Sequence, residues 1–411
     1  MNMNLEKYFK LKYIYLLSIV FCLFLTYLYR VDISFDTPSY INAWSTLQEC
    51  QIDIWRTPVY PVFLGIMNII FGDYYLYYVV VLQHIVFLIS IRYFYHLVQY
   101  TISTNTLSFF ITFFYALYPC VATYNCCIAT ETFAVTGVVF LFYSIFNLYK
   151  TRQLRFGLYC FFWLLFLVFL RPAVVYLLPV TIVLWCLVAL KSRKDYYKPV
   201  VYGITGSVIV SVLLVFYMGM FKVNYGVFTP SGIGLMNKYA IAKAAGAIDF
   251  KITKDNNLQF YQEVEKGINA MGMESFSELV NQSINRNKIR YAKRLLQNVL
   301  NASEDDLFKP SYSNGIIGVV SNIMGVKIKI IYLLFFIYAV VLLHWWNRHN
   351  DIAFFSSLLF MVGVSNYIIV IIASPGEYGR LLLPSIPAYL IMFGQLLNMI
   401  KFKRVCEVHG V

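Results

Sequence analysis

Two short polar segments interrupt the apolar N-terminal part of the chain. Residues 34–40 carry Asp36, and residues 53–61 carry Arg56. An acid at the point where a membrane helix meets water is costly, which makes it a functional candidate by default. A positioned carboxylate can accept the proton of an attacking hydroxyl group. Asp36 is therefore the candidate base, with a merely hydrated loop carboxylate as the alternative.

Two further arginines stand at breaks in apolar segments. Arg171 lies in the middle of an apolar run and is followed by Pro172. A charge there must reach water or a partner, so the run is expected to break into two spans with Arg171 at the surface. Arg380 precedes an apolar run, and its guanidinium either binds phosphate oxygens or snorkels at the membrane interface. Glu377 would orient Arg380 or neutralise it.

Glu131 and Tyr60 are the remaining candidates for this site. Glu131 lies just inside the start of an apolar run. It either caps a helix start, where the helix dipole favours negative charge, or pairs with Arg56 or Arg171. Tyr60 fits an interfacial aromatic belt, but its ring could also stack on the face of a sugar.

The composition places the chain in the membrane class. Of its 411 residues 60% are hydrophobic and 13% are charged, and the mean hydropathy is +0.66. The net charge of +13 does not indicate a nucleic-acid partner, because the basic residues gather at the ends of apolar runs and in one long loop. The five histidines and eight cysteines show no spacing typical of a metal site.

About ten apolar runs reach the roughly 20 residues that a membrane-spanning helix needs. Lys and Arg gather at the N-terminus, in alternate short loops and at the C-terminus. Because such residues mark cytoplasmic loops, an even number of spans predicts cytoplasmic N- and C-termini. The Tyr- and Lys-rich composition suits a bacterium, so the expected location is a bacterial inner (plasma) membrane. The runs lie near residues 11–29, 75–95, 107–124, 128–149, 154–170, 173–190, 200–220, 328–346, 352–373 and 381–400.

The predicted fold is an all-α polytopic membrane protein with a small helical cap outside the membrane. The N-terminal transmembrane region is 1–221 with an outer loop at 31–74, the extracytoplasmic loop is 222–326, and the C-terminal transmembrane helices occupy 327–411. Apolar residues recur every three to four positions in 258–270 and 276–302, which predicts cap helices. Residues 58–71 are apolar but short and contain two prolines, which favours a helix at the outer interface.

Five motifs occur together in this chain. They are Asp36 after the first span, the segment Arg56-Thr57-Pro58-Val59-Tyr60-Pro61-Val62-Phe63-Leu64, the pair Thr130-Glu131, the break Arg171-Pro172, and Gly379-Arg380 followed by Pro384 and Pro387. In this order they resemble membrane-embedded glycosyltransferases of the GT-C type. The resemblance is to the clade that uses lipid-linked phosphosugars, which includes protein O-mannosyltransferases and aminoarabinose transferases of lipid A. It covers most of the chain, although each motif alone is weak.

The resemblance implies a hexosyl- or pentosyltransferase that takes a sugar from a polyprenyl-phosphate donor within the membrane lipid. Asp36 would be the base, and the anomeric configuration would invert because no covalent intermediate is needed. The acceptor would be a lipid, a glycan or a protein. Asp36 stands alone rather than in an adjacent acid pair, with Asp32 as its only near acidic neighbour, which leaves the need for a divalent metal ion open. The residues expected to contact substrates are Arg56, Tyr60, Glu131, Arg171, Glu377 and Arg380.

Two other classes fit parts of the pattern. A polysaccharide polymerase of the Wzy type also has ten or more spans and a large outer loop, and would make Arg286, Arg290 and Arg294 central. A lipid or sugar transporter predicts buried charges or broken helices near the membrane midplane in paired halves. Here the polar residues gather at the outer edge instead, and the two halves show no symmetry.

Overall fold

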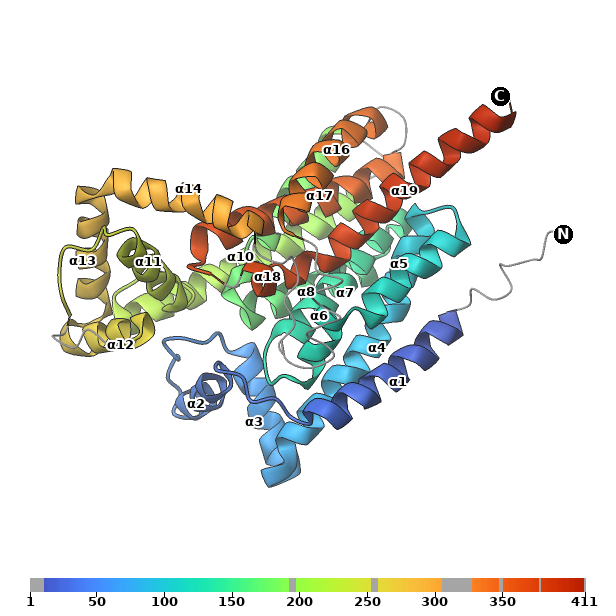
Figure 1. Cartoon of the computed structure of the whole chain (residues 1–411). Helices are drawn as coiled ribbons and strands as arrows, with labels where there is room; N and C mark the ends of the chain where they lie inside the picture. The colour runs from blue at the N-terminus through green and yellow to red at the C-terminus, as the bar shows by residue number, and fades with distance from the viewer. Residues whose placement is uncertain are drawn as a thin grey trace.

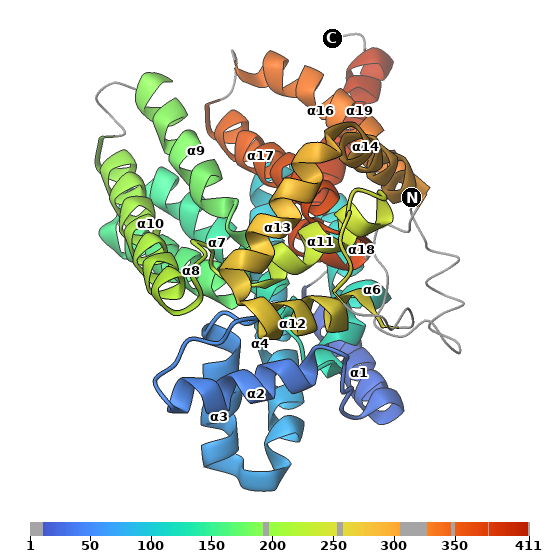
Figure 2. The ribbon, with the colours of Figure 1, turned by 90° about the vertical axis from the view of Figure 1, so that its left-hand side faces the viewer.

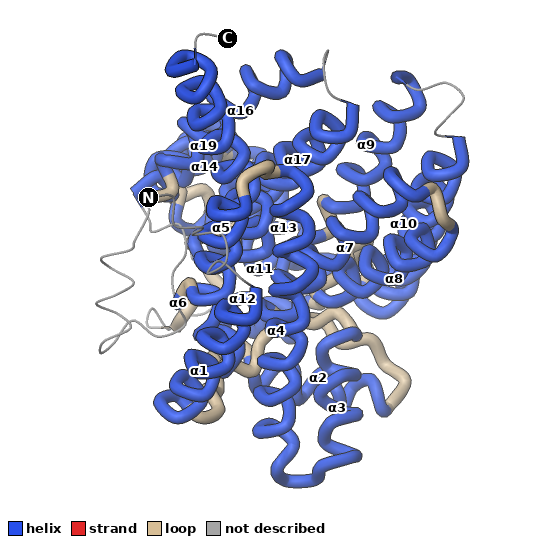
Figure 3. Tube along the Cα trace, turned by 90° about the vertical axis from the view of Figure 1, so that its right-hand side faces the viewer, coloured by secondary structure: helices blue, strands red, loops and turns tan. Residues whose placement is uncertain are grey.

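The computed structural model describes residues 11–191, 197–252, 258–304, 327–346, 350–376 and 378–409. Figure 3 shows this part of the chain as helices joined by loops. The helices are α1 Leu11–Tyr29, α2 Thr37–Gln48, α3 Val59–Phe71, α4 Tyr75–Thr101, α5 Asn105–Leu117, α6 Pro119–Ala122, α7 Glu131–Thr151, α8 Leu154–Leu170, α9 Leu177–Lys191, α10 Tyr197–Tyr225, α11 Ile233–Ala244, α12 Phe260–Met271, α13 Met273–Arg286, α14 Lys288–Glu304, α16 Lys329–Trp346, α17 Asn350–Ala373, α18 Tyr378–Leu381 and α19 Ile386–His409.

The fold is that of an all-α polytopic membrane protein, as predicted. Six helical segments of the described chain are long and apolar enough to cross a membrane, and three further apolar helices are shorter. Each predicted apolar run overlaps one helix of the bundle, namely α1, α4, α5, α7, α8, α9, α10, α16, α17 or α19. The run at 107–124 is wrong in its length: α5 ends at Leu117, because the residue before Pro119 disfavours the helical conformation.

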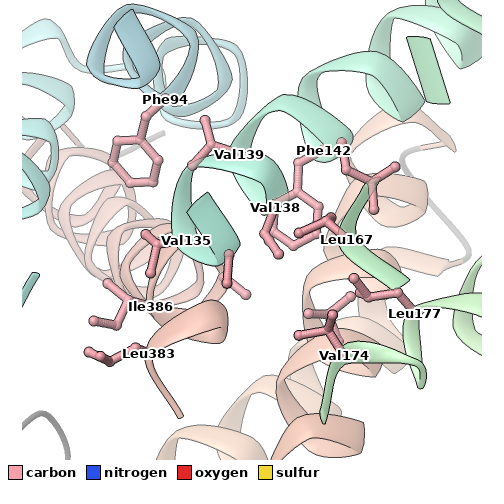
Figure 4. Close-up of a cluster of buried hydrophobic side chains, with 14 of the residues drawn as sticks. Phe94, Val135, Val138, Val139, Phe142, Leu167, Val174, Leu177, Leu383 and Ile386 are labelled. Carbon is pink, nitrogen blue, oxygen red and sulfur yellow. The ribbon is translucent and has the colours of Figure 1, made fainter. Parts of the chain in front are cut away.

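Helix α7 occupies the centre of the bundle. Most of its 21 residues are buried, and it packs against α4 and α8. Gly137 permits the contact with α8, because a Cβ atom there would lie 2.8 Å from Leu167. Small residues let membrane helices approach closely, and close packing holds such bundles together. Figure 4 shows Val135, Val138 and Val139 of α7 among the core side chains of neighbouring helices.

Helix α3, expected at the outer interface, forms a hairpin with α4. The short helix η2 (Gly72–Tyr74) joins them, and Gly72 has a φ of 56°, which glycine adopts readily. The hairpin is visible below the bundle in Figure 1. Its turn exposes large apolar side chains, with Ile69 72% and Ile70 63% exposed. An apolar tip of this kind is compatible with a position in the lipid interface.

Helices α11 to α13 form a cap at one end of the bundle, which faces the viewer in Figure 2. Helix α1 begins and α19 ends on the side of the molecule away from this cap (Figure 1). The cap has its own apolar cluster, in which Phe221, Tyr239 and Phe276 are buried. The helices predicted at 258–270 and 276–302 are present as α12, α13 and α14, whereas α11 was not predicted.

The loop between α2 and α3 shares the apolar cluster of the cap. Ile52 is buried in it, and Trp55 packs against it. The amide of Gly232 donates a hydrogen bond to the carbonyl of Ile54 at 2.6 Å, and the hydroxyl of Tyr225 donates to the carbonyl of Ile52 at 2.5 Å. The loop is therefore fixed to the cap by backbone contacts as well as by packing.

Replacing Gly232 with alanine is expected to destabilise this junction by about 1–3 kcal/mol, the usual effect of overpacking. A Cβ atom at Gly232 would lie 2.9 Å from the Trp55 ring and 3.0 Å from the Ile54 carbonyl oxygen. Thermal unfolding in detergent measures the effect. Gly234→Ala is the matched control, because nothing lies within 4 Å of a Cβ atom there. Equal melting temperatures for the two variants would show that Trp55 and Ile54 move to make room for the added methyl group at little cost in stability.

Candidate active site

The position of Asp36 is set by a short contact between two loops. After α1 the chain forms a bridge from Asp32 to Cys127, with amide-to-carbonyl distances of 2.9 Å and 3.0 Å. The hydroxyl of Thr37 then donates to the carbonyl of Ile128 at 2.9 Å. These contacts hold the start of α2 beside the start of α7. Asp36 is the N-cap residue of α2, but its side chain makes no capping hydrogen bond and remains available for other partners.

Arg56 is placed by its own loop and by the first turn of α2. One carboxylate oxygen of Asp53 accepts the amides of Trp55 and Arg56 at 2.8 Å and 2.6 Å, a turn that aspartate favours. The Arg56 guanidinium donates to the Ser39 hydroxyl at 2.7 Å and lies 4.2 Å from the centre of the Tyr40 ring. It also donates to Oδ1 of Asp36 at 2.6 Å.

Arg380 joins Asp36 to Glu131. Its Nη2 atom donates to Oδ2 of Asp36, and its Nε atom donates to Oε1 of Glu131 at 2.6 Å. The same Oε1 atom accepts Nη1 of Arg171 at 3.1 Å. The result is a chain of alternating charges, which we call the arginine–carboxylate chain, in the order Arg56, Asp36, Arg380, Glu131 and Arg171.

Two neighbouring members of the arginine–carboxylate chain, Glu131 and Arg171, lie at helix termini. Glu131 is the first residue of α7, where the helix dipole stabilises a carboxylate, and only 1% of its side chain is exposed. Arg171 follows the last residue of α8, and Pro172 prevents the helix from continuing. The predicted break at Arg171 is therefore present.

The neighbouring charges decide the protonation of Asp36. Burial by itself raises the pKa of the Asp36 carboxyl, but the guanidinium groups of Arg56 and Arg380 lower it by more, so that the net pKa lies well below the ordinary range. Burial lowers the pKa of Arg56, whereas Tyr40 and Asp36 raise it, with a net increase. Both residues are therefore ionised at neutral pH, and Asp36 in this arrangement holds a proton only weakly.

The arginine–carboxylate chain borders a cavity of about 1170 Å³ beneath the cap. Asp36, Arg56, Arg171 and Arg380 all line it. Its other walls are the inner face of α11, the start of α12 and the ends of α8 and α17 nearest the cap. Ligand pockets commonly measure about 300–1,000 Å³, so this cavity can hold two reactants together.

Two of the residues predicted to contact substrates, Tyr60 and Glu131, do not line the cavity. Tyr60 is completely buried, and its hydroxyl donates to Gln83 at 3.1 Å. Because it packs under Tyr40 and is absent from the cavity wall, its ring cannot stack on a sugar there. Glu131 likewise lies behind the wall and contacts the cavity through Arg171 and Arg380. Glu377 lies outside the described residues.

Several residues at or near the cavity were not predicted from the sequence. Ser39, which binds Arg56, follows Asp36 by one helical turn, a spacing that Thr37 and Pro38 at a helix start could have indicated. Asn237 and Lys243 of α11 face the cavity about two turns apart. At the rim, Phe35 meets Tyr261 of α12 with ring centres 5.1 Å apart. Pairing between distant segments leaves no signal in the sequence.

The described residues contain no group of three His, Cys, Asp or Glu side chains that could hold a metal ion. Both oxygens of Asp36 are bound by arginine, as is Oε1 of Glu131. The described part of the site therefore offers a divalent ion no pair of unengaged carboxylates.

A comparison with solved structures finds, among others, one protein with a similar structure. It is the archaeal oligosaccharyltransferase AglB from Archaeoglobus fulgidus, in complex with an inhibitory peptide and a dolichol-phosphate. The TM-score is 0.45 and the identity 13%, over 90% of this chain and 47% of that chain. This chain thus spans about half the length of that protein. Neither a family model nor a curated protein matches the sequence.

Proposed function

We propose that this protein is a membrane glycosyltransferase that moves a sugar from a polyprenyl-phosphate donor to an acceptor, with inversion and with Asp36 as the base. The supporting observation is that Asp36 shares one cavity with Arg56, Arg171 and Arg380. A base must lie near the cations that stabilise the departing phosphate, because proton removal and bond cleavage occur at the same sugar carbon.

The charges of the site favour an anionic ligand. The arginine–carboxylate chain contains three guanidinium groups and two carboxylates, and therefore carries one excess positive charge. Guanidinium groups bind phosphate oxygens with two parallel hydrogen bonds and remain charged. Arg380 is the middle member of the arginine–carboxylate chain, and its side chain is 21% exposed. It is the proposed principal phosphate ligand, with Arg56 and Arg171 beside it.

The two sides of the cavity suit two different ligands. Leu170, Ile369 and Leu381 form an apolar wall at the ends of the bundle helices. On the outer surface of α17, Ile368 and Ile372 are about half exposed. A polyprenyl tail would follow this apolar side into the membrane. The opposite wall, on the cap, carries Asn237, Lys243 and Gln259 among apolar residues and would receive a lipid, glycan or protein acceptor.

The proposed location of the cavity is the outer face of a bacterial inner membrane. The cap lies away from the start of α1 and the end of α19 (Figure 1), and the cavity lies beneath the cap. The distribution of basic residues predicts that both termini are cytoplasmic. A donor lipid would then be used after it has reached the outer leaflet.

Farnesyl phosphate, a short polyprenyl phosphate, is expected to raise the melting temperature of the purified protein in detergent. A ligand at 100 times its dissociation constant stabilises the folded state by about 2.7 kcal/mol. Farnesol, which has the same tail without the phosphate, is the control and should cause a much smaller shift. Equal shifts for the two compounds would contradict a phosphate site.

Arg290→Ala separates this proposal from a Wzy-type polymerase. Arg290 donates to the carbonyl of Gly246 at 3.2 Å, and Arg286 pairs with Asp249. Both side chains therefore make contacts within the cap, and neither lines the cavity. The Arg290→Ala variant should therefore keep most of its activity in an assay of sugar transfer from the polyprenyl phosphate. Loss of transfer in this variant would favour the polymerase instead.

A further inference from the structure

Both oxygens of the Asp36 carboxylate are occupied by arginine. Oδ1 accepts Nη2 of Arg56 at 2.6 Å, and Oδ2 accepts Nη2 of Arg380. A carboxylate bound in this way is a poor base, because protonation would break an ion pair. In this arrangement Asp36 therefore cannot perform the step proposed for it, and one of the two arginines must release it first.

The contacts of the two arginines indicate which one moves. Arg56 is held by Ser39 and Tyr40, which belong to the same loop and helix as Asp36. Moving Arg56 would break all of these contacts together. Arg380 comes instead from a distant part of the chain, and α18, which carries it, is only four residues long. Its link to Asp36 is one hydrogen bond at the end of a long side chain.

Glu131 provides the pivot for that movement. The Nε atom of Arg380 is bound to buried Glu131 at 2.6 Å, whereas its Nη2 atom faces Asp36 at the cavity wall. A small rotation of the guanidinium about the Glu131 contact would transfer Nη2 from Asp36 to a ligand in the cavity. The Nε atom of Arg380 would remain bound to Glu131 during this rotation.

We infer that the donor phosphate and Asp36 compete for Arg380, so that donor binding itself releases the catalytic base. This inference rests on the proposed function. Before the donor binds, Asp36 occupies the position of the phosphate on Arg380. When the donor arrives, Nη2 turns to a phosphate oxygen and Oδ2 of Asp36 becomes free, while Arg56 keeps Oδ1 in place. Only the donor-loaded enzyme can then activate an acceptor.

The transfer step is balanced in this scheme. The acceptor hydroxyl oxygen forms a bond to the anomeric carbon and gives its proton to Oδ2 of Asp36. The bond between the anomeric carbon and the phosphate oxygen breaks, and its electron pair leaves with the polyprenyl phosphate. Arg380, already bound to that phosphate, stabilises the added negative charge. As the phosphate product departs, Arg380 can return to Asp36 after the proton passes to water.

The test is the affinity of Asp36→Asn for farnesyl phosphate, measured by thermal shift and by calorimetry in detergent. Removal of a competing negative charge should tighten binding by about tenfold or more, because a like charge beside an anionic ligand opposes its binding. Asp36→Ser, which also lacks the charge, should bind more tightly as well and provides a second variant if the first folds poorly. Glu278→Gln removes an exposed carboxylate of α13 away from the cavity and should leave the affinity unchanged.

The outcomes separate the two proposals. If wild-type protein binds farnesyl phosphate no better than farnesol, the phosphate site and the proposed function fail. If wild-type protein prefers the phosphate, but folded Asp36→Asn and Asp36→Ser bind it equally or less tightly, the phosphate and Asp36 bind Arg380 together and the competition is excluded. Tighter binding by both variants, combined with unchanged binding by Glu278→Gln, supports the inference.

Discussion

Asp36→Asn is expected to slow sugar transfer by about 10²–10⁴-fold, the usual contribution of a positioned general base. Asparagine keeps the shape of the side chain and one acceptor oxygen, but it cannot take up the acceptor proton. The phosphate ligands Arg380 and Arg56 remain in this variant. The loss should therefore appear in kcat and not as an increase in the KM of the donor. Initial rates at varied donor concentration measure both constants.

Glu278→Gln is the control for this variant, because it removes the same charge from the cap without changing the cavity wall. It should retain the wild-type kcat. A wild-type kcat in Asp36→Asn would mean that the proton leaves by another route. In that case the cavity would retain its arginines without an identified base.

Glu131→Ala is expected to destabilise the protein by about 3–5 kcal/mol, because removing one partner of a buried ion pair leaves the other charge uncompensated. The Glu131 side chain is 1% exposed, and its Oε1 atom accepts both Arg171 and Arg380. The loss should appear as a lower melting temperature in detergent. Sugar transfer should fall as well, because Arg380 loses the contact that holds its Nε atom.

Glu131→Gln distinguishes charge from hydrogen bonding at this position. Glutamine keeps a carbonyl oxygen that can accept Arg380, but it lacks the negative charge that balances the two arginines. Its melting temperature should therefore lie between those of the wild type and Glu131→Ala. If Glu131→Ala melts at the wild-type temperature, Arg171 and Arg380 must find water or other partners at little cost, and Glu131 does not organise the site.

The bundle helices could be predicted because each is encoded by a continuous stretch of sequence. A run of apolar residues has few alternatives to a membrane helix, since backbone groups in lipid must be satisfied internally. The limits of the helices were predicted less well. Helix α5 ends at Leu117, before Pro119, although apolar residues continue beyond that point. Helix α11 was missed because its 12 residues do not separate into an apolar and a polar face.

The candidate site was only partly predictable for a related reason. Charge type and position relative to the apolar runs identified Asp36, Arg56, Arg171 and Arg380, which the structure places around one cavity. The connections between them depend on tertiary contacts such as the bridge from Asp32 to Cys127. Such contacts do not appear in local patterns. For the same reason, the burial of Tyr60 beneath Tyr40 could not be anticipated from its position near the start of an apolar segment.

The junction between the loop of residues 30–58 and the cap also limits how this protein can be re-engineered. Trp55 packs in the apolar cluster of the cap, and the Ile54 carbonyl is bound by Gly232. A chimera that receives a cap from a relative, in order to change its acceptor, would lose these contacts if it kept its own loop. The exchangeable unit would be the cap together with residues 30–58, even though more than 150 residues of chain separate them.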